Sequence, residues 1–353
     1  MTVSKEIKIN IDMAMDVEQL TNGGFSPLTT FLNYEELDSV LNNMRLPNGS
    51  IWPIPILFPV ENDFDISDIS KLILNYNGHQ LAILESPEIF DYNISNLINS
   101  FFGTDDILHP GVKKTMRFSG KFITGKLSSL NSLPRILGIN SLSPEQIKKI
   151  IKQKKLKTIV GFHTRNPPHK AHEYIHQSVL KKIDGLLLHP VIGSKKKGDF
   201  SSQSIISSYE MYFEKFVPQE RVILSPLLTY SRYGGPKEAI FTAIVRKNYG
   251  CTHFVVGRDH TGVKNFYGKY DSQKIFNDFD DIEIEIIPFS EPFYCSKTKE
   301  ITTKEECKFG DKYYQEISAT KIRKAIIEKS TIPDYYIRKE ILNLLQNMHD
   351  VFV

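Results

Sequence analysis

Residues 163–172 read His-Thr-Arg-Asn-Pro-Pro-His-Lys-Ala-His and gather side chains that bind oxyanions. Arg165 offers a planar fork of N–H donors that matches the oxygens of phosphate or sulfate. Thr164 and Asn166 add neutral hydrogen-bonding groups at the same place. The two prolines predict a turn into a helix, whose N-terminus presents free N–H groups and a positive dipole end to an anion. The stretch therefore indicates a phosphate or sulfate site.

His169 and His172 are three residues apart, so the spacing predicts that they share one face of the first helical turn. Two imidazoles beside a triphosphate bind its oxygens and stabilise the charge that develops as pyrophosphate leaves. One alternative is a buried capping turn with two histidines of the core. Another is a zinc site, although the glutamate that zinc hydrolases place between such histidines is missing.

The elements around this stretch predict a parallel sheet covered by helices, because strands recur about every thirty residues with helices between them. In such a sheet, ligands bind at the carboxyl ends of the strands, where residues 163–172 follow the first strand. The predicted strands are 157–162, 185–191, 221–228, 253–257 and 282–288, and the predicted helices include 168–182 and 236–248.

The part before this sheet lacks the regular alternation and predicts a mostly β domain with a few short helices. Its apolar run 51–60 contains three prolines and therefore predicts an edge or irregular strand. Ser143 marks the change, because it can cap a helix that begins with proline. The last segment is rich in Lys and Glu and ends in predicted helices over 318–328 and 333–347. The predicted domains are residues 1–143, 144–289 and 290–353.

Composition narrows the class of protein. The net charge of +3 over 353 residues does not indicate nucleic-acid binding. No stretch approaches the roughly 20 apolar residues that cross a bilayer, and the N-terminus has no apolar signal core. The three cysteines, Cys251, Cys295 and Cys307, do not form a disulfide framework. We therefore expect a cytoplasmic protein with no nucleic-acid or membrane partner.

Residues 163–172 resemble the signature of the ATP sulfurylase (sulfate adenylyltransferase) family, Gln-Thr-Arg-Asn-Pro-x-His-Arg-Ala-His. A second stretch, residues 257–262, Gly-Arg-Asp-His-Thr-Gly, is similar to the family's Gly-Arg-Asp-His-Ala-Gly. On its own, that stretch also fits a tight turn with Asp259 as a helix cap. Further family-like segments are residues 24–31, 188–193, 232–239 and 317–323.

The resemblance implies an α/β protein with a PUA-like, β-rich N-terminal domain. A Rossmann-like nucleotidyltransferase domain with a parallel sheet and a small C-terminal subdomain would follow. The implied reaction is ATP plus sulfate giving adenylyl sulfate and pyrophosphate, by in-line attack of a sulfate oxygen on the α-phosphorus. Mg²⁺ is expected on the ATP phosphates.

The resemblance also implies roles for individual residues. The implied catalytic residues are Thr164, Arg165 and Asn166. The implied ATP-binding residues are His163, Thr164, Arg165, Asn166, His169, His172, Gly257, Arg258, Asp259 and His260. The implied sulfate ligands are His163, Arg165 and Thr261. Arg232 is implied to lie on a mobile loop, with Gly234 and Gly235 as hinges, and the alternative is a solvated surface arginine.

Two residues depart from the family pattern on the sulfate side. His163 stands where the family has glutamine, and Thr261 stands where it has alanine. Another tetrahedral oxyanion is therefore an alternative acceptor, and a nucleotide-binding homologue without turnover is a third hypothesis.

Two further family features differ. Some members bind zinc through cysteines after a Pro-Phe-Tyr segment, but Thr298 stands where the second cysteine is expected, so we predict no zinc. The chain has no Gly-x-x-x-x-Gly-Lys-Ser/Thr loop and hence no fused adenylylsulfate kinase. A separate enzyme that consumes adenylyl sulfate, or a pyrophosphatase, is then expected as a partner. The family also implies a homo-oligomer.

Overall fold

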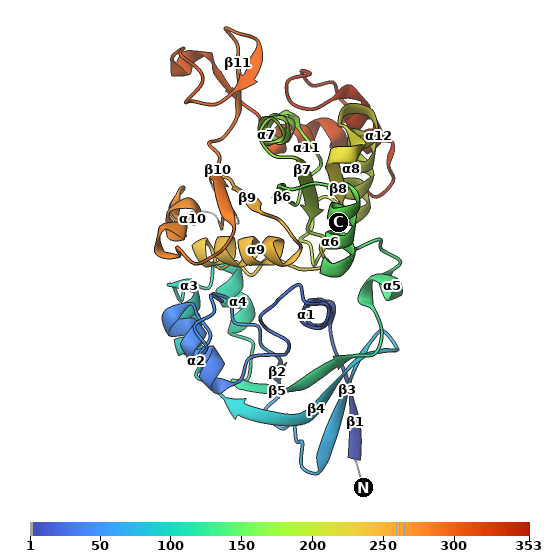
Figure 1. Cartoon of the computed structure of the whole chain (residues 1–353), viewed down its shortest axis with the longest axis vertical. Coiled ribbons are helices and arrows are strands. Elements are labelled where there is room, and N and C mark those ends of the chain that lie inside the picture. The colour runs from blue at the N-terminus through green and yellow to red at the C-terminus, as the bar shows by residue number, and fades with distance from the viewer. Residues whose placement is uncertain (1–2, 259, 261, 264–265) are drawn as a thin grey trace. The chain divides into compact units, whose positions relative to one another are not determined.

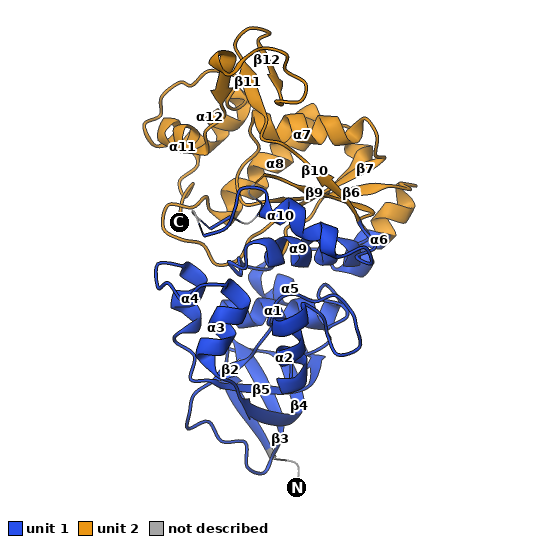
Figure 2. Cartoon of the chain, turned by 90° about the vertical axis from the view of Figure 1, so that its left-hand side faces the viewer, with its two compact units in different colours: residues 1–148, 228–250, 259–284 blue, residues 149–227, 251–258, 285–353 orange. Residues whose placement is uncertain are grey.

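The computed structural model describes residues 3–258, 260, 262–263 and 266–353 (Figure 1). The chain forms two compact units, and each is built from more than one segment (Figure 2). The first unit comprises residues 1–148, 228–250 and 259–284, and the second comprises residues 149–227, 251–258 and 285–353. The domain limits expected from the sequence remain a prediction.

The first unit contains a five-stranded sheet in the order β1-β3-β4-β5-β2. β1 is parallel to β3, and the other pairs are antiparallel. The proline-rich run 51–60 contributes only β2 at the edge of this sheet, as expected for a segment that lacks ladder donors. The elements of this unit are β1 (Val3–Lys8), α1 (Ile11–Asn22), α2 (Tyr34–Asn43), β2 (Pro59–Val60), β3 (Ile69–Tyr76), β4 (His79–Asp91), α3 (Ile94–Phe102), α4 (Pro110–Thr115), β5 (Lys121–Ser129), α5 (Leu133–Leu137), α9 (Pro236–Asn248), α10 (Asp271–Lys274) and η2 (Ile275–Asp278).

An aromatic cluster explains why α9 belongs to the first unit although it lies far along the chain. Phe241 of α9 packs edge-on against Phe25, with 5.1 Å between the ring centroids, and against Trp52 at 5.6 Å. All three side chains are almost completely buried. Burial of such large apolar side chains is the main favourable term in folding, so it holds α9 in this core.

The second unit contains a five-stranded sheet in the order β10-β9-β6-β7-β8, and every pair in it is parallel. The α/β fold class predicted from the sequence is thus confirmed. β6 lies in the centre, and the chain proceeds first to β7 and β8 on one side and later to β9 and β10 on the other. The strand order therefore reverses between β6 and β9, which is the position where open α/β sheets bind ligands.

The elements of the second unit are β6 (Ile159–Thr164), α7 (Lys170–Leu180), β7 (Gly185–Pro190), α8 (Ser202–Phe216), η1 (Gln219–Arg221), β8 (Val222–Leu224), β9 (His253–Val256), β10 (Glu285–Pro288), β11 (Phe293–Cys295), β12 (Glu300–Thr302), η3 (Asp311–Tyr313), β13 (Tyr314–Glu316), α11 (Ala319–Ile327) and α12 (Lys339–Asn347). A further helix, α6 (Pro144–Gln153), spans the limit between the units and begins with the predicted Ser143 cap, whose hydroxyl accepts from the Gln146 N–H. β11, β12 and β13 form a small antiparallel sheet of their own.

The core of the second unit joins the parallel sheet to four helices. Val160 and Phe162 of β6 share one apolar cluster with side chains of α7, α8, α11 and α12. β7 is buried along its whole length, as expected for a parallel strand that is covered on both faces. Among the described helices, none is both long enough and apolar enough to span a bilayer.

Several predicted boundaries were wrong by a few residues. The helix expected from residue 168 begins at Lys170, and the helix expected from residue 333 begins at Lys339. β8 ends at Leu224, two residues before Pro226, which cannot donate to a ladder. Local residue preferences do not determine where strand pairing stops, so such ends are the least predictable part of a fold.

Candidate active site

The stretch 163–172 lies at the carboxyl end of β6, as its position after a predicted strand indicates. His163, half-buried, and Thr164, buried, are the last residues of the strand. The Thr164 hydroxyl oxygen accepts the Asn166 N–H at 3.2 Å, which closes a tight turn. This turn leaves Arg165 exposed at its tip. A guanidinium in that position is accessible to an anion at the carboxyl edge of the sheet.

His169 and His172 come together at the N-terminus of α7. His169 is the N-cap rather than part of the first turn, and its Nδ1 accepts the His172 N–H at 3.4 Å. The two rings nevertheless stack, with 3.8 Å between their centroids. Burial lowers the pKa of His169 to about 4 and that of His172 well below its usual value. Both rings are therefore neutral near pH 7 and can donate one N–H each.

Two further cations lie near this turn. Burial lowers the pKa of Lys195 to about 8, and the positive charge of Arg165 lowers it as well, while Asp199 opposes this. Arg323 of α11 donates from Nη2 to the Asn166 side-chain oxygen at 3.4 Å. Lys195 and Arg323 therefore add positive charge near a turn that carries Arg165 and no acidic residue of its own, which favours an anionic ligand.

The second signature begins at the carboxyl end of β9, on the other side of the switch point from β6. A Cβ at Gly257 would meet no described atom within 4 Å, so the space around it is open. Arg258 forms an ion pair with Glu291 at 2.7 Å. His260 belongs to the first unit, where its Nε2 lies 3.0 Å from the Thr242 hydroxyl. Asp259 and Thr261 lie outside the described residues.

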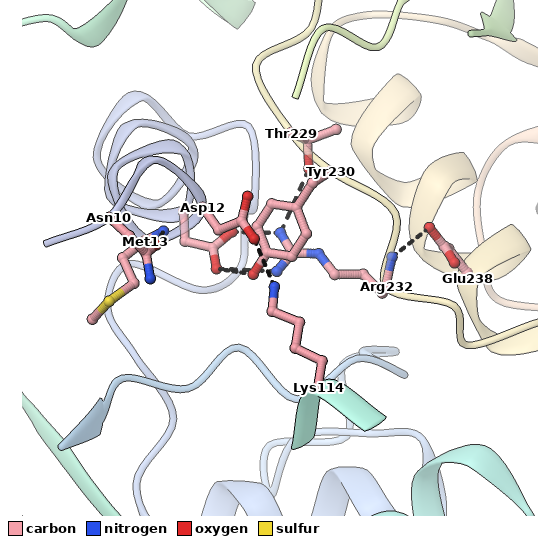
Figure 3. A network of polar contacts seen from close by, with 9 residues as sticks. Asn10, Asp12, Met13, Lys114, Thr229, Tyr230, Arg232 and Glu238 are labelled. Atoms are coloured by element: carbon pink, nitrogen blue, oxygen red, sulfur yellow. Dashed lines mark hydrogen bonds and ion pairs between the residues drawn. The ribbon is translucent and has the colours of Figure 1, made fainter. Parts of the chain in front are cut away.

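Arg232 belongs to the first unit and is buried, so the alternative of a solvated surface arginine is wrong. Its guanidinium forms a two-pronged ion pair with Asp16 and lies 3.7 Å from the centroid of the Tyr230 ring. Figure 3 shows this network, in which the Arg232 N–H also donates to Glu238 at 2.9 Å. In this structure Arg232 thus bonds to Asp16 and Glu238, which belong to the same unit.

The two glycines after Arg232, expected as hinges, have tight surroundings. Gly235 has a φ of +55°, and a Cβ there would lie 2.5 Å from the Tyr267 ring. A Cβ at Gly234 would lie 2.8 Å from the Phe101 ring. Close packing therefore suffices to explain both glycines, and a hinge role remains a prediction.

The cysteines expected to bind no zinc lie side by side. Cys295 of β11 and Cys307 have their sulfur atoms 3.7 Å apart. In the part of the chain that the structure describes, no three His, Cys, Asp or Glu side chains cluster as a metal site. The absence of zinc stays a prediction.

Comparison with known proteins decides the family. The ATP-sulfurylase family model matches residues 140–348, and a PUA-like domain model matches residues 2–132. The chain belongs to the ATP-sulfurylase family. The PUA-like N-terminal domain and the nucleotidyltransferase-like domain with its parallel sheet, both expected from the sequence, are confirmed.

The relatives in this family match along nearly their whole length. The sulfate adenylyltransferase of Pyrococcus abyssi is 37% identical over 349 residues, which cover 99% of this chain and 92% of that protein. The sulfate adenylyltransferase of Synechococcus sp. (strain JA-3-3Ab) is 40% identical over 336 residues, which cover 94% of this chain and 86% of that protein.

A solved structure, the hexameric APS kinase from Thiobacillus denitrificans, matches with a TM-score of 0.75 and 19% identity. The match covers 98% of this chain but 63% of that longer one. At this identity the likeness shows the fold alone.

Sequence reasoning missed three side chains near the site: Lys195, Arg323 and Tyr209, whose hydroxyl lies 3.1 Å from Nδ1 of His172. Arg323 lies in a segment that resembled the family, 317–323, but no role was assigned to it. Lys195 follows the strand β7, a position that could have drawn attention to it. Tyr209 carries no such signal, because a tyrosine in an amphipathic helix usually belongs to the core.

Proposed function

We propose that this chain catalyses the reaction of ATP with sulfate to adenylyl sulfate and pyrophosphate. The observation that carries the proposal is the position of the two signatures. Residues 163–169 end β6 and continue beyond it, residues 257–258 follow β9, and these neighbouring strands flank the switch point of the parallel sheet. Two loops that meet at this edge are well placed to hold a nucleotide triphosphate.

In the proposed reaction, a sulfate oxygen attacks the α-phosphorus of ATP. One S–O–P linkage forms, the bond between the α-phosphorus and its bridging oxygen to the β-phosphorus breaks, and pyrophosphate leaves with the electron pair. The protein needs no covalent nucleophile, because positioning and charge neutralisation supply most of the catalysis in such transfers. Mg²⁺ enters with ATP as part of the substrate.

We assign Arg165 to the bridge between sulfate and the α-phosphate, because this residue is exposed at the tip of the turn and its guanidinium matches such oxygens. Thr164 and Asn166, the residues directly before and after Arg165, stabilise the transition state. The neutral N–H groups of His169 and His172 bind the ATP phosphates. Gly257, Arg258, Asp259 and His260 hold ATP, and His163 and Thr261 contact sulfate. Arg232 lies on the proposed mobile loop, and it can close over the site only when its ion pair with Asp16 opens.

The chemistry also bears on partners. Adenylyl sulfate synthesis is uphill, so an enzyme that consumes adenylyl sulfate or hydrolyses pyrophosphate must draw it forward. We place this reaction in the cytoplasm and expect the chain to act as a homo-oligomer, which light scattering on the purified protein would test.

The decisive experiment is an acceptor screen with the purified protein. We expect pyrophosphate release from ATP that depends on sulfate and exceeds release with phosphate or phosphonates, with selenate as a close analogue. His163, half-buried where the family has glutamine, makes a different oxyanion the second candidate acceptor. Turnover with another oxyanion and none with sulfate would refute the proposal.

A further inference from the structure

Tyr209 links two parts of the proposed site, the end of β6 and the first turn of α7. It lies in the middle of α8 and has no exposed surface. Its hydroxyl is 3.1 Å from Nδ1 of His172 and also hydrogen-bonds the side chain of Thr164. Thr164 ends β6 and His172 belongs to α7. One phenol group therefore connects the strand end and the helix that present the proposed phosphate-binding residues.

The direction of these hydrogen bonds decides which ring nitrogen of His172 carries the proton. The Asn166 N–H can only donate, and it donates to the Thr164 oxygen at 3.2 Å. The Thr164 hydroxyl proton has two acceptors within reach, the Asn166 carbonyl oxygen at 3.1 Å and the phenol oxygen of Tyr209. Burial raises the pKa of Tyr209, so the phenol keeps its own proton. When the Thr164 proton points at Tyr209, the phenol proton is directed at Nδ1 of His172. When it points at the Asn166 carbonyl, the phenol donates to Thr164 and Nδ1 of His172 has to carry the proton.

The direction matters because the His172 ring is neutral. A neutral imidazole carries one N–H, and the partner of one nitrogen determines whether the other donates or accepts. An Nδ1 that accepts from Tyr209 leaves the proton on Nε2. The neighbouring His169 has the same arrangement. Its Nδ1 accepts the backbone N–H of His172, which leaves the ring proton of His169 on Nε2.

We propose that Tyr209 is a positioning residue that donates to Nδ1 of His172 and thereby keeps an N–H on Nε2 for the ATP phosphates. This rests on the proposed function, in which His172 binds those phosphates. Without the phenol hydroxyl, His172 can take the opposite tautomer and present a lone pair that repels phosphate oxygens.

The same helix supplies a matched control. Tyr212 lies one turn further along α8 and is 1% exposed. Within the described part of the chain, its hydroxyl has no hydrogen-bond partner. Tyr209→Phe and Tyr212→Phe therefore remove the same atom from the same buried helix, but only the first removes a bond to the site.

The experiment has a kinetic arm. We expect Tyr209→Phe to lower kcat for sulfate-dependent pyrophosphate release about tenfold, the effect of one lost hydrogen bond, while Tyr212→Phe stays near wild type. In a His172→Ala background, Tyr209→Phe should add little further loss, because its effect passes through His172. Equal effects of the two tyrosine variants, or full additivity with His172→Ala, would overturn the proposal.

The second arm is independent of activity. Nitrogen NMR of histidine-labelled protein distinguishes a protonated from a bare ring nitrogen. We expect the wild-type His172 to carry its proton on Nε2 and Tyr209→Phe to show a mixture of tautomers. A wild-type proton on Nδ1 refutes the proposal whether or not the variants fold. Failure of the wild type to use sulfate would count against the proposed function instead.

Discussion

At the scale of single residues, Arg165 carries most of the proposed chemistry. It is exposed at the tip of the turn after β6, and Lys195 and Arg323 add positive charge around it. The buried Thr164 and the N-capping His169 belong to the framework as well as to the site. Substitution of Arg165 should therefore change activity with little effect on stability, whereas substitution of Thr164 or His169 should change both.

We expect Arg165→Ala to lower sulfate-dependent pyrophosphate release by at least about a hundredfold, as loss of a transition-state donor does. The midpoint of thermal unfolding should stay within about 2 °C of wild type, because exposed substitutions away from special features cost little. Arg117→Ala, another exposed arginine, is the control. Activity retained in Arg165→Ala would show that the assigned role is wrong.

At the scale of elements, the buried ion pair between Asp16 of α1 and Arg232 holds the loop before α9. The two side chains are 3% and 6% exposed, so neither charge has much access to water. The Tyr230 hydroxyl donates to the same carboxylate at 2.9 Å. Such a pair adds little net stability, but removal of one partner leaves a buried charge without compensation.

Asp16→Ala should therefore lower the free energy of unfolding by about 3–5 kcal/mol, measured by urea unfolding. The control is Asp281→Ala, which removes a two-pronged pair with Arg45 whose side chains are 59% and 31% exposed. That change should cost less than about 1 kcal/mol, since solvent screens exposed pairs. Similar costs for both variants would contradict a compensating role for the buried carboxylate.

At the scale of the whole molecule, buried histidines should make the fold sensitive to acid. Burial lowers the pKa of His176 to about 3, and that of His169 to about 4, from the usual 6.5. The unfolded chain therefore binds more protons than the folded chain below pH 6.5. Stability is fully present above that pH and is lost as the pH falls towards 4, by at most about 1.4 kcal/mol per pH unit for each histidine.

His176 allows a direct test, because it is fully buried and its ring nitrogens have no hydrogen-bond partner among the described residues. His176→Leu should leave stability at pH 7 unchanged or raised and make the loss between pH 6.5 and 4 less steep. The exposed His79 gives the control variant, His79→Leu, which should keep the wild-type slope. Urea unfolding across this pH range measures both, and identical slopes would exclude His176 as the cause.

The sequence alone predicted the five strands of the parallel sheet, the helices α7, α11 and α12, and the stretch that carries the proposed chemistry. These features are local: apolar periodicity, helix caps and the turn from Thr164 to Pro168 depend on neighbours in the chain. Only the tertiary structure showed that Asp16 meets Arg232, because 216 residues separate them. It also showed that Tyr209 reaches from α8 to His172. A phenol or a carboxylate acquires such a role through packing between distant elements, which no local residue pattern encodes.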